Sequence, residues 1–231
     1  MNDIFTTDGE LSLAKVSAVI SGDSFRLFRE NLAQLRRLMT YYRCAMMEVE
    51  TKFRVLNAQF SLENDRNHIE SIRTRLKSMD SIIGKLNRRE LPLSVDSIEK
   101  NLNDVAGIRV ICPFVDDIYV LVDCLIRQDD LELVEIKDYI KHPKENGYRS
   151  LHLIITIPIF LQEETRRMKV EVQLRTIAMD FWASLEHQMR YKKDIPPSMA
   201  QRLARDLGEC ADISAMLDQR MQDIKNGLDQ S

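Results

Sequence analysis

Glycine and cysteine are both scarce in this chain, and each scarcity excludes a kind of site. Seven glycines in 231 residues leave no match to the glycine-rich loop of Walker-type phosphate sites. The four cysteines lie far apart, without the close pairs of a zinc site or a disulfide framework, and are typical of reduced thiols. No apolar run is long enough to cross a bilayer, and the first ten residues lack the regions of a secretory signal. We therefore expect a cytoplasmic protein without a membrane partner.

An excess of charge of one sign is also lacking. Charged residues make up 30% of the chain, yet the net charge is only -3. This balance argues against a protein whose whole surface is basic, as in many nucleic-acid-binding proteins, although basic residues can still gather locally. With 44% hydrophobic residues the chain can bury a sizeable core.

Helical and strand-like hydrophobic periodicities alternate along the chain. Helical patterns occupy residues 23–57, 78–88, 117–127, 176–192 and 198–228, and strand patterns occupy 71–77, 105–112, 131–136, 151–157 and 168–175. Pro158 is expected to end the fourth strand, and Pro196-Pro197 to break the chain before the last helix. We predict an α+β fold in which a mixed five-stranded β-sheet is preceded and followed by helices.

The last predicted helix carries a coiled-coil-like seam. Spacings of four and three alternate through Leu203, Leu207, Cys210, Ser214, Leu217, Met221, Ile224 and Leu228. The pattern is typical of contact with another chain and equally of a helix packed on its own domain, so both interpretations stay open.

Basic residues cluster between positions 66 and 89, with seven lysines and arginines against two acidic residues. Strand alternation places Arg73, Arg75 and Lys77 on one face, and a helix capped by Ser78 places Ser81, Lys85 and Arg88 on another. These side chains could converge on a triphosphate through charge-assisted hydrogen bonds. The alternative is a solvated basic surface, which is the commoner explanation of a charge run.

Two carboxylates belong to predicted strands. Asp104 directly precedes the strand that holds Arg109, and Glu171 lies on the polar face of a strand that alternates polar and apolar residues. Magnesium usually takes one or two protein carboxylates together with phosphate oxygens and water, so neighbouring strands could supply such a site. An ordinary solvent-facing Glu171 is the alternative. Asp104 and Arg109 would point to opposite faces of an ideal strand, so one of them is expected outside regular strand geometry.

A turn signal marks the segment from Lys144 to His152. Asn146-Gly147 predicts a tight bend that places Tyr148 where its ring could stack on a nucleobase. His152 could bond a phosphate or a ribose, although a single histidine at the start of a strand is more often structural.

Five motifs in order resemble the synthetase domain of RelA/SpoT-type alarmone synthetases. They read Arg75-x-Lys77 with Ser81, Lys85 and Arg88; Asp104-Val-Ala-Gly-Ile-Arg109; His-Pro-Lys144-Glu-Asn-Gly-Tyr148-Arg-Ser-Leu-His152; Glu171-Val-Gln173-Leu-Arg175-Thr; and Phe181-Trp182-Ala183-Ser-Leu-Glu186-His187. The resemblance covers roughly residues 66–192, and the short length with helical flanks resembles the stand-alone small alarmone synthetases.

The resemblance implies a GTP pyrophosphokinase of the bacterial stringent response. Such enzymes use Mg²⁺ and transfer the β,γ-pyrophosphate of ATP to the 3′-hydroxyl of GDP or GTP, which gives ppGpp or pppGpp and AMP. It also implies a nucleotidyltransferase-like core at residues 66–192, an N-terminal helical segment at 1–65 and a C-terminal oligomerisation helix at 193–231. A homotetramer is the implied assembly.

The resemblance also implies roles for individual residues. Those for ATP are Arg75, Lys77, Ser81, Lys85 and Arg88, with Arg109 against the adenine. Asp104 and Glu171 are the implied metal ligands and catalytic residues, and Glu171 would also activate the 3′-hydroxyl. For GDP or GTP they are Lys137, Lys144, Asn146 and His152 at the phosphates and ribose, Tyr148 stacked on guanine, and Gln173 and Ala183 lining the pocket.

Two departures qualify the resemblance. Long members of the family carry Arg-x-Lys-Asp or Glu-x-Asp-Asp where this chain has Glu135-Ile-Lys-Asp138, which leaves the metal preference open. No adjacent His-Asp pair occurs in the sequence, so we expect synthesis without the hydrolase activity of bifunctional members.

Other functions compete with this one. A nucleotide-sensing or RNA-binding protein could use the same basic residues and Tyr148, but Asp104 and Glu171 would then repel a phosphate backbone unless a metal lay between them. A purely helical oligomerisation protein would leave the polar strands unexplained. A regulatory site for an alarmone or single-stranded RNA, and the preference between GDP and GTP, stay open.

Overall fold

A mixed five-stranded sheet forms the centre of the computed structural model, which describes residues 22–64, 66–190 and 197–230. The strands are β1 (Ser71–Leu76), β2 (Ala106–Cys112), β3 (Glu132–Asp138), β4 (Leu151–Phe160) and β5 (Thr165–Thr176), in the order β1-β2-β5-β4-β3. Only the β2 and β5 pair is parallel among these neighbours. The predicted mixed five-stranded sheet is confirmed. The predicted N-terminal segment before residue 22 and the break at Pro196 lie outside the described residues.

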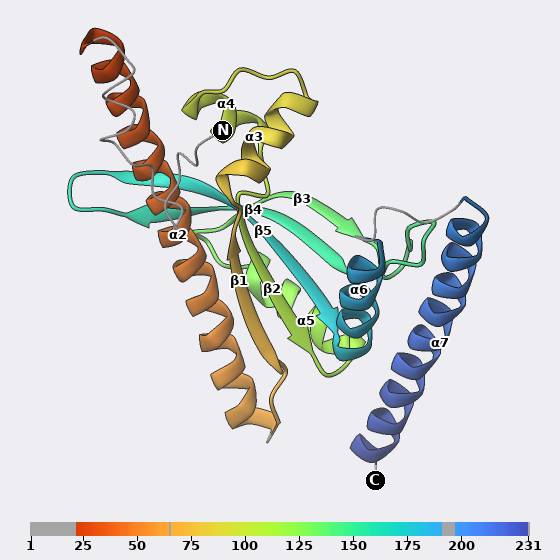
Figure 1. The fold of residues 1–231 in the computed structure, drawn as a ribbon. Coiled ribbons are helices and arrows are strands. Elements are labelled where there is room, and N and C mark those ends of the chain that lie inside the picture. Colours follow the sequence, from red (N-terminus) through yellow and green to blue (C-terminus); the bar gives the residue numbers. More distant parts are fainter. Residues whose placement is uncertain (1–21, 65, 191–196, 231) are drawn as a thin grey trace.

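Helices cover one face of the sheet and flank its ends (Figure 1). They are α2 (Gly22–Asn64), α3 (Met79–Arg88), α4 (Val95–Asn101), α5 (Val115–Ile126), α6 (Ile177–Arg190) and α7 (Pro197–Asp229). The long α2 packs on β1, β2, β4 and β5, and it also contacts α5, which packs on β2 and β5. In the described part of the chain no helix is both long and apolar enough to span a membrane.

The core lies between α2, α5 and the apolar face of the sheet. Helix α2 contributes a stripe at spacings of three and four, made by Leu38, Tyr42, Ala45, Val49, Phe53 and Leu56. Alternate residues of the central strands, such as Ile108 and Val172, are also fully buried. Because strand side chains alternate between faces, the intervening residues point to the opposite face. That face carries the polar side chains.

Local sequence signals set several boundaries as predicted. The Ser78 side chain accepts a hydrogen bond from the Ser81 backbone at the start of α3, and Thr176 accepts one from the Met179 backbone at the start of α6. Asp104 lies just before β2, so it is the residue outside regular strand geometry. Helix α4 was not predicted, although Ser94 caps it through the Ser97 backbone.

Several predicted boundaries differ from the structure, and the ends of β4 and α2 have clear physical causes. Strand β4 continues through Pro158, which pairs with Arg167 of β5. Strand β3 pairs with β4 only as far as Thr156, so Pro158 lies where β4 has lost one neighbour and a missing backbone N–H costs little. Helix α2 runs to Asn64 instead of residue 57, because no glycine or proline interrupts the added residues.

Helix α7 packs on its own domain through small and polar residues. Thr176 donates a hydrogen bond of 2.6 Å to Asp218, and Trp182 Nε1 donates one of 2.9 Å to the Leu207 carbonyl. Ala211 is buried in this contact. Apolar residues of the predicted seam, including Leu217 and Ile224, remain 53% and 58% exposed. Packing on the domain is therefore confirmed, and it leaves the apolar part of the seam uncovered.

Candidate active site

The strand register brings five polar residues into one row across the sheet. Lys137 of β3 pairs with His152 of β4, His152 with Gln173 of β5, Gln173 with Arg109 of β2, and Arg109 with Arg73 of β1. Directly paired residues point to the same face of a sheet. The row therefore crosses all five strands on the face opposite α2.

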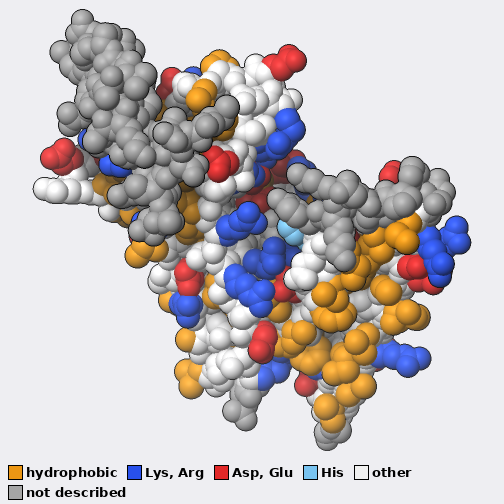
Figure 2. Space-filling model, viewed as in Figure 1, with side chains coloured by type: hydrophobic (Ala, Val, Ile, Leu, Met, Phe, Trp, Pro, Cys, Tyr) orange, Lys and Arg blue, Asp and Glu red, His pale blue; other side chains and the backbone are white. Residues whose placement is uncertain are grey.

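Basic and acidic side chains from four elements line a cavity of about 600 Å³ beside this row. Its lining includes Arg73, Arg75 and Lys77 from β1 and its end, Asp80, Ser81, Gly84 and Arg88 from α3, Asp104, Gly107, Ile108 and Arg109 from β2 and its approach, and Glu171 and Gln173 from β5. Figure 2 shows lysine and arginine side chains gathered on this part of the surface. The polar faces predicted for β1 and α3 thus meet at one cavity.

Asp104 lies between two lysines at the cavity wall. Its Oδ2 atom is 2.6 Å from Lys77 Nζ and 2.7 Å from Lys85 Nζ. Burial acts to raise the pKa of Asp104, but the hydrogen bonds from the two lysines outweigh it and hold the pKa below its usual value. The Oδ1 atom is buried and has no hydrogen-bond partner among the described residues. The carboxylate is therefore ionised at neutral pH with one oxygen available to a ligand.

Glu171 faces the same cavity from the neighbouring strand, where it pairs with Gly107. Gln173 Nε2 donates a 3.0 Å hydrogen bond to Glu171 Oε2, and His152 Nδ1 lies 3.6 Å from Glu171 Oε1. Burial acts to raise the pKa of Glu171, while the interactions with His152 and Gln173 lower it, and the net pKa lies below its usual value. A second ionised carboxylate therefore lines the same cavity as Asp104.

An aromatic and basic loop lies next to Glu171. The Tyr148 hydroxyl is 2.8 Å from His152 Nε2, and Lys144 Nζ lies 5.0 Å from the centre of the Tyr148 ring. Asn146 Nδ2 donates a 3.2 Å hydrogen bond to Glu186 of α6, and its Oδ1 accepts one from the Tyr148 backbone. Lys144 and Tyr148 thus present a cation and an aromatic ring beside the polar row.

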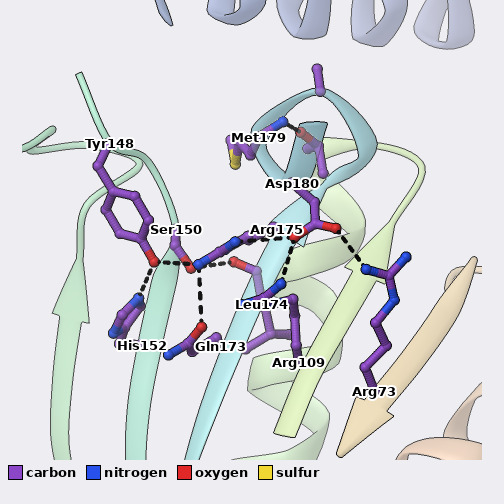
Figure 3. Close-up of polar contacts among 12 residues, drawn as sticks. Arg73, Arg109, Tyr148, Ser150, His152, Gln173, Leu174, Arg175, Met179 and Asp180 are labelled. Carbon is purple, nitrogen blue, oxygen red and sulfur yellow. Dashed lines mark hydrogen bonds and ion pairs between the residues drawn. The ribbon is translucent and has the colours of Figure 1, made fainter. Parts of the chain in front are cut away.

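Arg175 and Asp180 complete the polar contacts beside the row, where Arg175 follows Gln173 by two residues on β5 (Figure 3). Arg175 donates 2.7 Å to the Tyr148 hydroxyl and 3.0 Å to Asp180 Oδ1. No role was predicted for either residue. The alternation of polar and apolar residues in β5 places Arg175 on the polar face, and this pattern could have marked it as a site residue. Asp180 is a single acidic residue in the first turn of α6, and no sequence pattern distinguishes it.

Comparison with known proteins identifies the family to which this chain belongs. The family described as "Region found in RelA / SpoT proteins" matches residues 74–196. The GTP pyrophosphokinase YwaC of Bacillus subtilis (strain 168) is 43% identical over 190 residues, which span 81% of this chain and 89% of that protein. The chain belongs to the RelA/SpoT family.

Solved RelA/SpoT relatives share the fold. Small alarmone synthetase 1 of Bacillus subtilis, bound to its product pppGpp, aligns with a TM-score of 0.75 and 34% identity over 84% of this chain and 97% of that one. Small alarmone synthetase 2 of the same species aligns with a TM-score of 0.74 and 41% identity over 84% of this chain and 98% of that one. The predicted α+β architecture is therefore that of the small alarmone synthetases.

In this RelA/SpoT chain most predicted site residues meet at the cavity or the row. Arg75, Lys77, Ser81, Arg88, Asp104, Arg109, Glu171 and Gln173 line the cavity, Lys85 reaches it through Asp104, and His152 and Tyr148 adjoin Glu171. Lys137 lies at the far end of the row, where it pairs with Glu135 at 3.0 Å. Ala183 is buried in an apolar cluster with Trp182 and Ala211, against which Tyr148 packs. Ala183 thus belongs to the apolar cluster on which the Tyr148 side chain packs.

Proposed function

We propose that this chain is a GTP pyrophosphokinase that transfers the β,γ-pyrophosphate of ATP to the 3′-hydroxyl of GDP or GTP. The observation that carries the proposal is the pair of ionised carboxylates, Asp104 and Glu171, in a cavity that four arginines and a lysine also line. A polyanionic substrate and a divalent cation together would balance those charges. The name of the Bacillus subtilis relative YwaC and the pppGpp-bound structure of small alarmone synthetase 1 support the same reaction.

The β1 and α3 side of the cavity is the proposed ATP site. Arg75, Lys77, Ser81, Lys85 and Arg88 would hold the phosphates, and Arg109 would lie against the adenine. Lys77 and Lys85 are occupied by Asp104 in this structure. Both ammonium groups can turn to phosphate oxygens when ATP enters, because the two lysines share a single carboxylate oxygen.

Asp104 and Glu171 are the proposed magnesium ligands. The fit rests on Asp104 Oδ1, a buried oxygen without a hydrogen-bond partner among the described residues. The described residues contain no group of three or more metal-binding side chains, which suits a cation that completes its shell with phosphate oxygens and water. Magnesium, when bound, would neutralise charge on the transferred group.

The loop beside Glu171 is the proposed acceptor site. Tyr148 would stack on guanine, Gln173 and Ala183 would shape the pocket, and Lys137, Lys144, Asn146 and His152 would contact phosphates and ribose. Glu171 is already ionised, so it can accept the proton of the 3′-hydroxyl as that oxygen attacks the β-phosphorus of ATP. The bond to the β-phosphorus breaks on the AMP side, and AMP leaves. Substrates of this kind would place the enzyme in the cytoplasm.

We also propose that α7 assembles the enzyme into a homo-oligomer, with the four subunits that the resemblance to the small alarmone synthetases implies. Hydrophobic side chains gather over α7 in Figure 2. The exposed large hydrophobic residues of this helix include Ile213, Met216, Leu217, Met221 and Ile224. A second copy of the same helix would cover them. Light scattering on the purified chain and on Leu217→Glu tests this. A mass for Leu217→Glu equal to that of the unchanged chain would contradict an interface at this position.

The reaction itself is tested with labelled ATP, magnesium and either GDP or GTP, followed by separation of the nucleotides. We expect label to move to the guanine nucleotide with release of AMP, and the better acceptor will identify the preferred substrate. Glu171→Gln should abolish transfer, whereas Glu132→Gln, a strand glutamate of β3 paired with Arg167, should not. Nucleotide binding without any transfer by the unchanged protein would instead favour a sensing function.

A further inference from the structure

Asp180 is a single carboxylate shared by three arginines. Its Oδ1 atom accepts hydrogen bonds of 3.1 Å from Arg109 and 3.0 Å from Arg175, and its Oδ2 atom lies 3.4 Å from Arg73. The Asp180 side chain is only 10% exposed. Figure 3 shows the three guanidinium groups arriving from three neighbouring strands. One negative charge on α6 therefore holds three positive charges of the sheet together.

Two of these arginines belong to the proposed ATP side. Arg73 and Arg109 both line the cavity, and they pair directly across β1 and β2. Burial, followed by the positive charge of Arg175, lowers the pKa of the Arg109 guanidinium, whereas the charge of Asp180 acts in the opposite direction. Arg109 Nε is buried without a hydrogen-bond partner among the described residues. The contact with Asp180 thus orients the Arg109 guanidinium group, whose positive charge is otherwise disfavoured by burial and by Arg175.

The third arginine belongs to the proposed acceptor side. Arg175 reaches from Asp180 to the Tyr148 hydroxyl at 2.7 Å, and the same nitrogen donates to Gln173 Oε1 at 3.2 Å. Its guanidinium carbon lies 5.1 Å from the centre of the Tyr148 ring. Tyr148 and Gln173 are both proposed acceptor-site residues. Asp180 therefore acts on the acceptor site through Arg175.

We infer that Asp180 is a positioning residue for both nucleotides, since its one carboxylate orients Arg109 toward ATP and, through Arg175, Tyr148 toward the guanine. The inference rests on the proposed function, which assigns the two pockets. Without the carboxylate, three neighbouring guanidinium groups would repel one another and turn toward solvent. Both pockets would then lose orientation from one change, although Asp180 is not among the residues that line the cavity.

The test compares Asp180→Asn with a matched variant, Asp117→Asn. Asp117 is also a buried helical carboxylate, 1% exposed and paired with both guanidinium nitrogens of Arg66, but neither residue lines the cavity. We expect Asp180→Asn to raise the KM of ATP and the KM of the acceptor, each by about tenfold or more, because this factor corresponds to the free energy of one charge-assisted hydrogen bond. The fall in kcat should be smaller. Asp117→Asn should lower the melting temperature and leave both KM values unchanged. Asp180→Glu keeps the negative charge, so its two KM values should lie between those of Asp180→Asn and those of the unchanged enzyme.

Binding can also be measured without turnover. Trp182 is the only tryptophan in the chain and packs with Ala183 and Ala211 in the cluster against which Tyr148 lies, so we expect its fluorescence to change when GDP binds. We expect weaker binding of GDP and of a non-hydrolysable ATP analogue by Asp180→Asn. The inference is overturned if only one nucleotide is affected, or if Asp180→Asn merely loses stability as Asp117→Asn does. If Asp180→Asn does not fold, Asp180→Glu carries the same comparison. Failure of the unchanged enzyme to make product would refute the proposed function alone, because the two titrations still test Asp180.

Discussion

Replacing Gly147 with alanine should damage the acceptor site through two separate effects. Gly147 has φ = +85°, a backbone conformation that residues with a Cβ rarely adopt. A Cβ built there would also lie 2.5 Å from the Ala211 Cβ of α7. The turn that precedes Tyr148 is therefore closed against α7, and both the turn and the contact require glycine.

The size of the effect follows from these two numbers. The left-handed conformation costs a non-glycine residue about 1–2 kcal/mol. Two carbon atoms prefer a separation of about 3.5–4.0 Å, so the added methyl group must displace α7 or the loop by about 1 Å, at a cost of about 1–3 kcal/mol. Together these effects remove about 2–5 kcal/mol from a stability of typically about 5–15 kcal/mol. We expect the loop to move, because α7 is anchored on both sides of the contact by Trp182 and Thr176.

The assay measures the KM of each nucleotide and the melting temperature for Gly147→Ala, Ala211→Gly and the double variant. Gly147→Ala should raise the acceptor KM more than the ATP KM, because the loop carries Tyr148. The double variant should be more stable than the sum of the single changes by about 1–3 kcal/mol, since it removes the contact and keeps only the φ penalty. Gly227→Ala is the matched control, because its Cβ would meet nothing within 4 Å. A Gly147→Ala protein with unchanged acceptor KM and stability would refute the reasoning.

Three further predictions concern single side chains. Asp104→Asn removes a proposed metal ligand and should lower kcat by about 100-fold or more, and a normal rate at saturating Mg²⁺ would contradict this role. Tyr148→Phe keeps the stacking ring but loses the hydroxyl contacts, so we expect the acceptor KM to rise only a few-fold, with a larger rise in Tyr148→Ala; equal effects would argue against stacking. Burial raises the pKa of Asp218 despite its hydrogen bond from Thr176, so the folded state holds the carboxyl proton more tightly than the unfolded state. The stability that this proton contributes is therefore lost as the pH rises from the ordinary pKa of an aspartate, about 3.9, through the raised pKa of Asp218. Asp218→Asn should therefore increase the melting temperature at pH 7 and flatten its dependence on pH, and a decrease would show that the charge itself stabilises α7.

The sequence predicted the elements of the fold well because their signals are local. Alternation in β5 separated Glu171, Gln173 and Arg175 from their apolar neighbours, and the cap at Ser78 started α3 where predicted. The error at Pro158 arose because a local rule was applied where the pairing of the strands decides. Pro158 was taken to end β4, but whether a strand tolerates proline depends on which neighbour it still has at that position.

The candidate site was predicted in part. The basic faces of β1 and α3 and the carboxylates Asp104 and Glu171 were found from residue pattern and resemblance, and all of them reach one cavity. Asp180 could not be found in this way, because its importance comes from three arginines that lie between 5 and 107 residues away in sequence. A pattern read along one element contains no information about such partners.

Periodicity and capping, read from the sequence alone, determined which residues form strands and helices and which face of each is polar. The tertiary structure alone decided the register, which aligns Lys137, His152, Gln173, Arg109 and Arg73 in one row across five strands. It also decided that α7 closes against Gly147 while leaving its apolar residues exposed. The physical reason is that register and helix docking are set by burial and charge pairing between distant segments, whereas alternation is fixed by the geometry of each strand.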